Sequence, residues 1–123
     1  MKYTIFTYGT LMKGQRNHRY LEKSRYLCDG VLEDHELFDS KYDYPCAVRS
    51  TGHRVYGEVY KIDEKTKKEV DELEGVGFLY DRTEVTIQTE SGKVKALFYE
   101  YLQATAELRP YTIKGKWIAY KDR

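Results

Sequence analysis

The sequence has few of the features that mark secreted or membrane proteins. Only 2 of its 123 residues are cysteines and only 2 are prolines. Cys28 and Cys46 form no C-x-x-C pair, so we expect two reduced thiols rather than a disulfide framework. No apolar run approaches the roughly 18 residues of a membrane span, and the N-terminus lacks the long apolar stretch of a signal peptide. We therefore expect a cytoplasmic protein with no membrane partner.

An excess of charge of one sign is also absent. The chain carries 21 lysines and arginines against 20 aspartates and glutamates, which gives a formal net charge of +1. Binding to nucleic acids depends on a concentrated basic surface, so this balance argues against a nucleic-acid partner. The densest basic cluster, at 65–68, has a glutamate on each side, and a solvent-exposed helix face explains it better than a binding site.

The common signatures of metal and cofactor sites are missing as well. His18, His35 and His53 lie in separate stretches, and no two of them have the spacing of metal ligands. His18, beside Arg19, is expected to anchor a loop or face solvent rather than act as a base. The chain contains no nucleophile elbow, P-loop or G-x-G-x-x-G motif. We therefore expect neither a metal ion nor a cofactor, and none of these features predicts an oligomeric state.

What the sequence does contain is an alternation of apolar and polar residues, typical of β-strands, over much of its length. The pattern at 26–40 predicts two short strands with a break near Glu33 and Asp34. Continuous strands are predicted at 2–8, 54–62, 80–89 and 93–101.

Two helices are predicted between these strands. Asn17 is expected to cap a short helix through Leu21, and Asp63 to cap a longer helix that runs to Glu74 and is ended by Gly75. Consecutive strands joined by short turns predict one α+β (mixed) domain over residues 1–123. Its sheet is expected to be antiparallel or mixed, curled or closed into a barrel, with the two helices beside it.

The first candidate for a binding site is the segment Tyr8-Gly9-Thr10-Leu11, where the first predicted strand ends at a glycine. A strand that turns at a glycine can leave several consecutive backbone N–H groups unpaired. Such groups bind an anion, or the oxyanion that forms when a carbonyl is attacked. Glycine also lets the backbone approach a ligand closely. On spacing alone, an ordinary turn is the commoner explanation.

The second candidate is Glu74, in the last turn of the longer predicted helix, where the helix dipole disfavours a carboxylate. Apolar residues such as Leu73, Val76 and Phe78 surround it in sequence. Burial and the dipole would both favour the protonated form, which suits a glutamate to acid/base work near neutral pH. A surface glutamate that merely tolerates its position is the alternative on sequence alone, and Glu72 is the nearest rival carboxylate.

The segment YGTLMKGQRNHRYL at 8–21 closely resembles the opening motif of the γ-glutamylcyclotransferase-like family. Its Y-G-T-L-x-x-G-x-x-N-H form is most similar to the γ-glutamylamine cyclotransferase branch. The resemblance continues in the expected order over most of the chain. It includes GEVY at 57–60, VDELEG at 70–75, YDRT at 80–83 and GKW at 115–117. The first motif together with the glutamate segment is a specific combination, whereas GEVY alone is not.

This resemblance implies a small barrel with helices beside it, and an enzyme that needs no cofactor. The catalytic glutamate of the family matches Glu74, and Tyr80 and Tyr99 stand where family members have pocket tyrosines. The family's substrate-holding loop matches Tyr8, Gly9, Thr10 and Leu11. The region 26–49 matches poorly, so the resemblance implies no substrate contacts there.

The implied reaction converts a γ-glutamyl amine or γ-glutamyl amino acid to 5-oxoproline and a free amine. A γ-glutamyl amide carries its own nucleophile, the α-amine, so intramolecular attack needs no activated water. Glu74 is expected to take the proton from this amine and return it to the leaving amine. The expected partner is thus a small γ-glutamyl substrate, whose leaving amine the sequence does not identify. A non-catalytic binding module with the same pocket is the alternative, and the presence of Glu74 argues against it.

Overall fold

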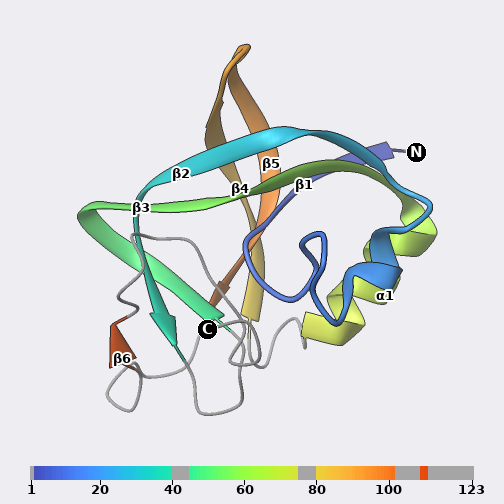
Figure 1. The fold of residues 1–123 in the computed structure, drawn as a ribbon, viewed down its shortest axis with the longest axis horizontal. Helices are drawn as coiled ribbons and strands as arrows, with labels where there is room; N and C mark the ends of the chain where they lie inside the picture. The colour runs from blue at the N-terminus through green and yellow to red at the C-terminus, as the bar shows by residue number, and fades with distance from the viewer. Residues whose placement is uncertain (1, 40–44, 75–79, 102–108, 111–123) are drawn as a thin grey trace.

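The structure is a computed structural model of the chain, and it describes residues 2–39, 45–74, 80–101 and 109–110. No helix among these residues is long and apolar enough to cross a bilayer. The predicted Gly75 helix end and the GKW segment at 115–117 lie outside the described residues. The elements follow in the order β1 (Lys2–Thr7), η1 (His18–Leu21, a 3₁₀ helix), β2 (Arg25–Asp39), β3 (Pro45–Asp63), α1 (Glu64–Glu74), β4 (Tyr80–Thr89), β5 (Gly92–Tyr101) and β6 (Arg109–Pro110) (Figure 1).

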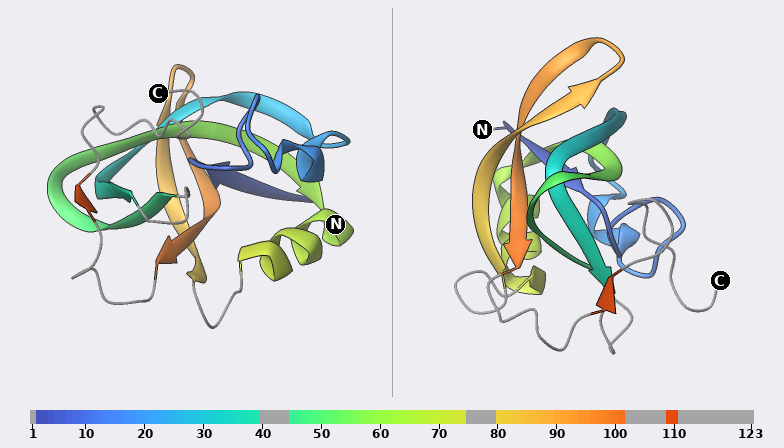
Figure 2. Two further views of the ribbon diagram at one scale, coloured as in Figure 1. Left: turned by 60° about the horizontal axis from the view of Figure 1, so that its bottom comes forward. Right: turned by 90° about the vertical axis from the view of Figure 1, so that its left-hand side faces the viewer.

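The strands form a curled mixed sheet. Their order is β3-β1-β5-β4-β2-β6, and an additional pairing of β2 with β3 closes the first five strands on themselves, with β6 attached to β2. All the pairings are antiparallel except that of β1 with β5, where Ile5 lies opposite Leu97. The two views of Figure 2 show the long strands β2 and β3 wrapping around the others. The predicted fold class is therefore confirmed.

The β2–β3 pair differs most from the prediction. A break near Glu33 and Asp34 was expected, but β2 runs through it with only a register shift between Glu33 and His35. Asp34 lies at this shift, and its φ is 57°, a conformation that aspartate tolerates better than most residues. β3 also begins earlier than predicted, because 45–49 pairs with 35–39 of β2. Cross-strand hydrogen bonds hold this segment in a strand although its own sequence alternates poorly.

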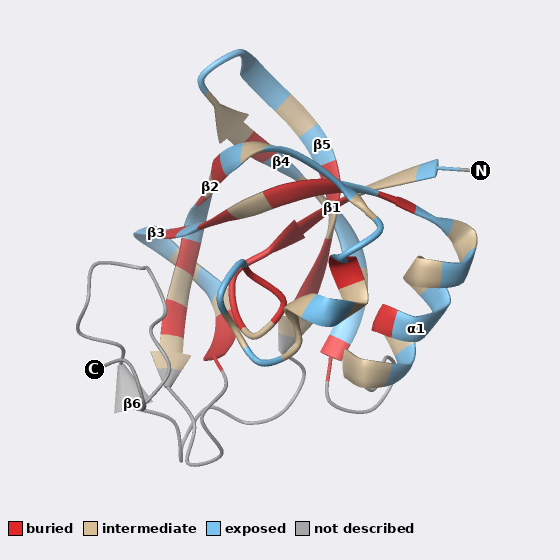
Figure 3. Ribbon diagram, turned by 45° about the vertical axis from the view of Figure 1, so that its right-hand side comes forward, coloured by how far each residue is buried: buried red, intermediate tan, exposed pale blue. Residues whose placement is uncertain are grey.

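The core consists of two clusters of buried side chains, which lie on opposite faces of the sheet. Figure 3 shows the buried positions along the strands in red. Neighbouring residues in a strand point to opposite faces, so Phe6 belongs to the first cluster and Ile5 to the second. On β3, Val59 and Tyr60 divide in the same way. Both faces are thus covered, which explains why β1 ends in consecutive buried residues.

Gly57 on β3 lets two strands approach closely inside this core. A Cβ at this position would lie 2.3 Å from the carbonyl oxygen of Thr7 and 2.7 Å from the Phe6 ring. Backbone cannot move aside as the end of a long side chain can, so a larger residue would push β1 away from β3. Glycine at 57 therefore permits the close approach of β3 to Phe6 and Thr7 of β1.

The helices cover the second cluster. The predicted cap is confirmed, because the Thr66 N–H donates to Asp63 Oδ1 at 2.8 Å, and this bond lowers the pKa of Asp63. Val70 is buried completely and Leu73 packs against the same cluster. Leu21 of η1 joins them. The last turn of α1 is thereby held beside the sheet, near the end of β1.

Candidate active site

A cavity of ≈ 200 Å³ lies where the loop after β1, the end of α1 and strands β4 and β5 meet. It is lined by most of the candidate site residues that the sequence and the resemblance indicate. They are Tyr8, Gly9 and Thr10 from the loop, Glu74 from α1, Tyr80 from β4 and Tyr99 from β5. Leu11 lies elsewhere, because its side chain is 1% exposed and packs in the second core cluster. The remaining lining residues are Phe6, Thr7, Arg16, Asn17, Pro45 and Leu73.

The loop after β1 is folded by hydrogen bonds that use its carbonyl groups. Gly9 O accepts from Met12 N at 3.1 Å, and Thr10 O accepts from Asn17 N at 2.9 Å. Leu11 O accepts from His18 Nδ1 at 2.8 Å, so His18 anchors the loop, as predicted. These bonds fix the shape of the loop beside the cavity.

Asn17 has a different role from the one predicted. It precedes η1, but its side chain makes no capping bond to that helix. Instead Asn17 Nδ2 donates to Thr10 Oγ1 at 2.9 Å. The amide closes the loop across seven residues and lines the cavity, which a helix cap would not do.

The N–H groups of Gly9, Thr10 and Leu11 donate to no acceptor in the part of the chain that the structure describes. Three consecutive N–H groups at the end of a strand form the kind of nest that binds anions and oxyanions. Two of the three residues line the cavity. Within the described residues, the loop therefore offers unpaired N–H donors at the edge of the cavity.

Gly9 allows the loop to lie against Pro45. A Cβ at position 9 would lie 2.6 Å from Pro45 Cγ and 2.8 Å from Pro45 Cδ. Contacts below 3.0 Å between such carbons force one of the two segments to move. The glycine is therefore required by a close approach within the protein, and the cavity wall depends on it.

Glu74 is the last residue of α1 and is partly exposed through the cavity that it lines. Burial of its carboxyl raises the pKa from its ordinary value of 4.5 to about 7. The expected effect of desolvation is thus present, and it leaves the protonated and ionised forms in similar amounts near neutral pH. A group with this property can both accept and donate a proton. Glu72, the rival carboxylate, is exposed on the same helix.

The three tyrosines of the cavity donate their hydroxyl protons to the protein. Tyr8 donates to Tyr99 O at 2.9 Å, Tyr80 to Pro45 O at 2.9 Å, and Tyr99 to Asp71 Oδ1 at 2.7 Å. Burial raises the pKa of each phenol, and the nearby charge of Glu74 raises it further. The phenols therefore stay neutral, and their oxygens can only accept further hydrogen bonds.

Two residues of the cavity, Arg16 and Asn17, were not selected as site residues from the sequence. Arg16 is the one positively charged residue among the described residues that line the cavity. A single arginine in a loop belongs to no periodic pattern in the sequence, so its place at the cavity becomes visible only in the folded loop. Among the described residues, no group of three or more His, Cys, Asp or Glu could hold a metal ion.

The pKa of Glu74 leads to a prediction about stability. Its folded-state pKa of about 7 exceeds its ordinary value of 4.5, so the folded protein binds this proton more tightly than the unfolded chain. The free energy of unfolding is expected to fall as the pH rises from about 4.5 to about 7, by on the order of 3 kcal/mol. Urea unfolding across this range measures the slope. Glu74→Gln should remove this component, and an unchanged slope in that variant would contradict the assignment.

Residues 5–119 match the family model described as "Gamma-glutamyl cyclotransferase, AIG2-like". The chain belongs to this family. It is accordingly an enzyme of the γ-glutamylcyclotransferase type. The expectation drawn from the loop and glutamate motifs is confirmed at this level.

Named relatives support the assignment of the chain to the γ-glutamylcyclotransferase family. The chain is 40% identical over 121 residues to a Vibrio cholerae protein provisionally named a γ-glutamylcyclotransferase, covering 95% of this chain and 96% of the other. It is 34% identical over 110 residues to the γ-glutamylaminecyclotransferase of Bos taurus, covering 82% and 66%. It is 33% identical over 103 residues to the γ-L-glutamyl-butirosin B γ-glutamyl cyclotransferase of Niallia circulans, covering 79% and 65%. The names of the last two specify different γ-glutamyl substrates.

Solved structures show the same fold. The AIG2-like protein of Mus musculus superposes with a TM-score of 0.79 at 24% identity and covers 99% of each chain. At this identity the likeness concerns the fold alone. The ytfP protein of Escherichia coli superposes with a TM-score of 0.71 at 32% identity, over 98% of this chain and 99% of the other.

Proposed function

We propose that this enzyme cyclises a γ-glutamyl amine or γ-glutamyl amino acid to 5-oxoproline and releases the amine. The observation that carries the proposal is Glu74, a carboxyl with a pKa of about 7 that lines the same cavity as the Gly9–Thr10 loop. An acid/base group and a row of N–H donors are the two things that this reaction requires. The cytoplasmic location and the lack of a nucleic-acid partner remain predictions from the sequence.

The first half of the reaction forms a bond. The α-amine nitrogen of the γ-glutamyl group attacks the γ-carbonyl carbon and closes a five-membered ring, while ionised Glu74 takes a proton from the amine. The carbonyl oxygen becomes an oxyanion, which the N–H groups of Gly9 and Thr10 stabilise. Holding the substrate in a reactive conformation supplies much of the rate, because the attack is intramolecular.

The second half breaks the original amide bond. The oxyanion collapses, the bond from the γ-carbon to the leaving nitrogen breaks, and protonated Glu74 gives its proton to that nitrogen. The products are 5-oxoproline and a neutral amine, so the reaction consumes no water, metal ion or cofactor. Glu74 ends ionised, as it began.

The test is release of 5-oxoproline, followed by chromatography, from a panel of γ-glutamyl amines and γ-glutamyl dipeptides. Release from at least one member supports the proposal, and the best substrate identifies the leaving group. A folded protein that is inert on the whole panel would refute it and favour the non-catalytic binding module. Binding of 5-oxoproline to an inert protein would then support that second candidate.

Arg16 gives a prediction about the leaving group. It is exposed at the cavity, where a guanidinium can pair with the carboxylate of a leaving amino acid. We expect Arg16→Gln to raise KM for γ-glutamyl dipeptides about two- to fivefold, as for an exposed ion pair, with less effect on γ-glutamyl amines.

The control for this measurement is Arg25→Gln, which removes an exposed arginine that does not line the cavity. KM should stay unchanged for both substrate types in this variant. An equal rise in KM for all substrates with Arg16→Gln would instead assign Arg16 to the α-carboxylate that they share. Unchanged KM throughout would exclude Arg16 from substrate binding.

A further inference from the structure

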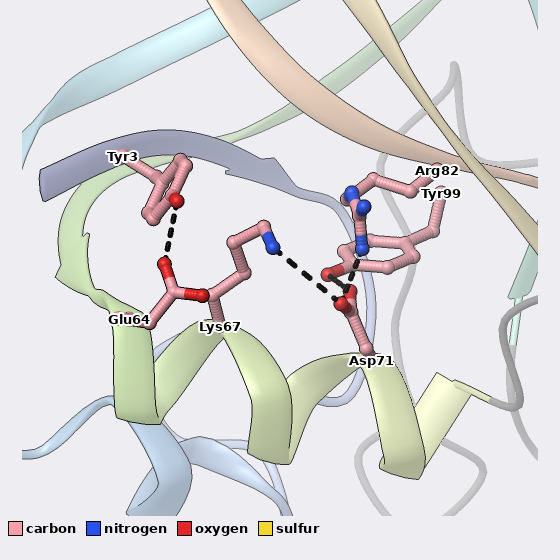
Figure 4. A network of polar contacts seen from close by, with 6 residues as sticks. All are labelled: Tyr3, Glu64, Lys67, Asp71, Arg82 and Tyr99. Carbon is pink, nitrogen blue, oxygen red and sulfur yellow. Dashed lines mark hydrogen bonds and ion pairs between the residues drawn. The ribbon is translucent and has the colours of Figure 1, made fainter. Parts of the chain in front are cut away.

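A second carboxylate lies one helical turn before Glu74 and makes a cluster of polar contacts that the proposed reaction does not use. Asp71 Oδ1 accepts the hydroxyl proton of Tyr99, and Asp71 Oδ2 pairs with the guanidinium of Arg82 (Figure 4). Lys67 Nζ lies 3.9 Å from the same oxygen. The Asp71 side chain is only 20% exposed, so these contacts are better shielded from solvent than an ordinary surface ion pair.

The contacts of Asp71 join three elements around the cavity. Asp71 is on α1, Arg82 on β4 and Tyr99 on β5. Tyr99 lines the cavity, and so does Tyr80, two residues before Arg82 on the same face of β4. The cluster therefore connects the helix that carries Glu74 to the two strands that form the opposite part of the cavity wall.

Apolar packing alone holds α1 weakly. Val70 is its one fully buried residue, Leu73 is partly buried, and the other side chains are half-buried or exposed. Val70 fixes the middle of the helix, whereas in the last turn only the partly buried Leu73 packs against the core. Asp71 supplies the missing constraint, because it is bound from two strands and lies on the same side of the helix as Glu74.

We propose that Asp71 is a positioning residue, which fixes the last turn of α1 so that the Glu74 carboxyl stays in place against the cavity wall formed by Tyr99. The inference rests on the cyclisation proposed above, in which Glu74 moves the proton. A proton-transfer group must lie within hydrogen-bond reach of the substrate nitrogen, and a displacement of about 1 Å can cost a hundredfold in rate. Asp71 itself needs no contact with the substrate.

The same helix provides a matched control. Tyr3 on β1 donates its hydroxyl proton to Glu64 Oε2 in the first turn of α1, so a phenol–carboxylate bond holds each end of the helix (Figure 4). Glu64 lies ten residues before Glu74, about 15 Å along the axis. Loss of this bond should affect the attachment of α1 without displacing Glu74.

The test compares Asp71→Asn with Glu64→Gln, each of which neutralises one carboxylate on α1. With Asp71→Asn we expect kcat to fall about ten- to a hundredfold while KM changes less than about threefold, since binding by the loop is untouched. With Glu64→Gln we expect kcat within about twofold of the unmodified enzyme. Thermal unfolding of both variants shows whether each has lost a similar amount of stability.

The results distinguish a positioning role of Asp71 from a purely structural role and from failure of the proposed cyclisation. An equal loss of kcat in both variants, or normal kcat in Asp71→Asn, would overturn the positioning role while leaving the cyclisation intact. An unmodified enzyme that is inert on the substrate panel would refute both proposals. If Asp71→Asn does not fold, Arg82→Lys decides, because it keeps the charge but loses the planar contact with Asp71. It should lower kcat with little change in KM, and normal kcat would overturn the role.

Discussion

Glu74→Gln is expected to abolish 5-oxoproline release while leaving ligand binding almost unchanged. Glutamine has the shape and the neutrality of protonated glutamate, so the cavity should keep its form, but it cannot accept a proton. Loss of a general acid/base group typically costs a factor of about 10² to 10⁴ in rate, and here one group serves both halves of the reaction. The measurements are kcat on the best panel substrate and the affinity for 5-oxoproline by calorimetry.

The control is Glu72→Gln, which removes an exposed carboxylate from the same helix. It should leave kcat within about twofold, because a solvated carboxylate has little effect on the cavity. Turnover that survives in Glu74→Gln, with the protein folded, would remove Glu74 from the mechanism. If Glu72→Gln lost as much turnover as Glu74→Gln, the charge of the helix, and not the position of Glu74, would be responsible for the loss.

Gly9→Val is expected to fail in another way, with loss of both turnover and binding. Its Cβ would meet the Pro45 ring at 2.6 Å, so the loop or the proline segment must move, and the N–H donors move with the loop. The loss of one well-placed oxyanion donor costs about 3 kcal/mol of barrier, which corresponds to a fall in kcat of more than a hundredfold. KM should rise as well, in contrast to Glu74→Gln.

Gly14→Ala is the matched control in the same loop. Gly14 has a φ of 80°, so alanine is strained there, but no heavy atom lies within 4 Å of the added Cβ. The variant should lose about 1–2 kcal/mol of stability from backbone strain and keep its kcat. If Gly9→Val bound 5-oxoproline and turned over normally, the loop would not form the binding site.

The sequence predicted the features that arise from local chemistry. Asp63 caps α1 because a helix start needs an acceptor for its free N–H groups, and this requirement is visible in any sequence. Glu74 could be selected because a carboxylate at a helix C-terminus among apolar neighbours is out of place. Burial raises its pKa to about 7, the effect that its apolar neighbours suggest, while its catalytic role stays a prediction.

Features that depend on distant segments could not be predicted in this way. The turn at Asp34 lies within one continuous strand only because β3 supplies hydrogen-bond partners on both sides of it. The sequence predicts Asn17 as a helix cap, and only the fold brings Thr10 within reach of its amide. Likewise, the requirement for glycine at position 9 comes from Pro45, more than 30 residues later in the chain.

The parallel pairing of β1 with β5 has a consequence for how the enzyme forms. Ile5 of β1 lies opposite Leu97 of β5, so β1 completes its place in the sheet only when β5 is present. Such contacts between remote segments must overcome a large loop-closure entropy and slow folding relative to hairpins such as β4–β5. During synthesis on the ribosome, the loop and Glu74 emerge well before Tyr99. The cavity therefore comes into existence only after β5 has been made, and a nascent fragment that ends before Tyr99 has no complete active site.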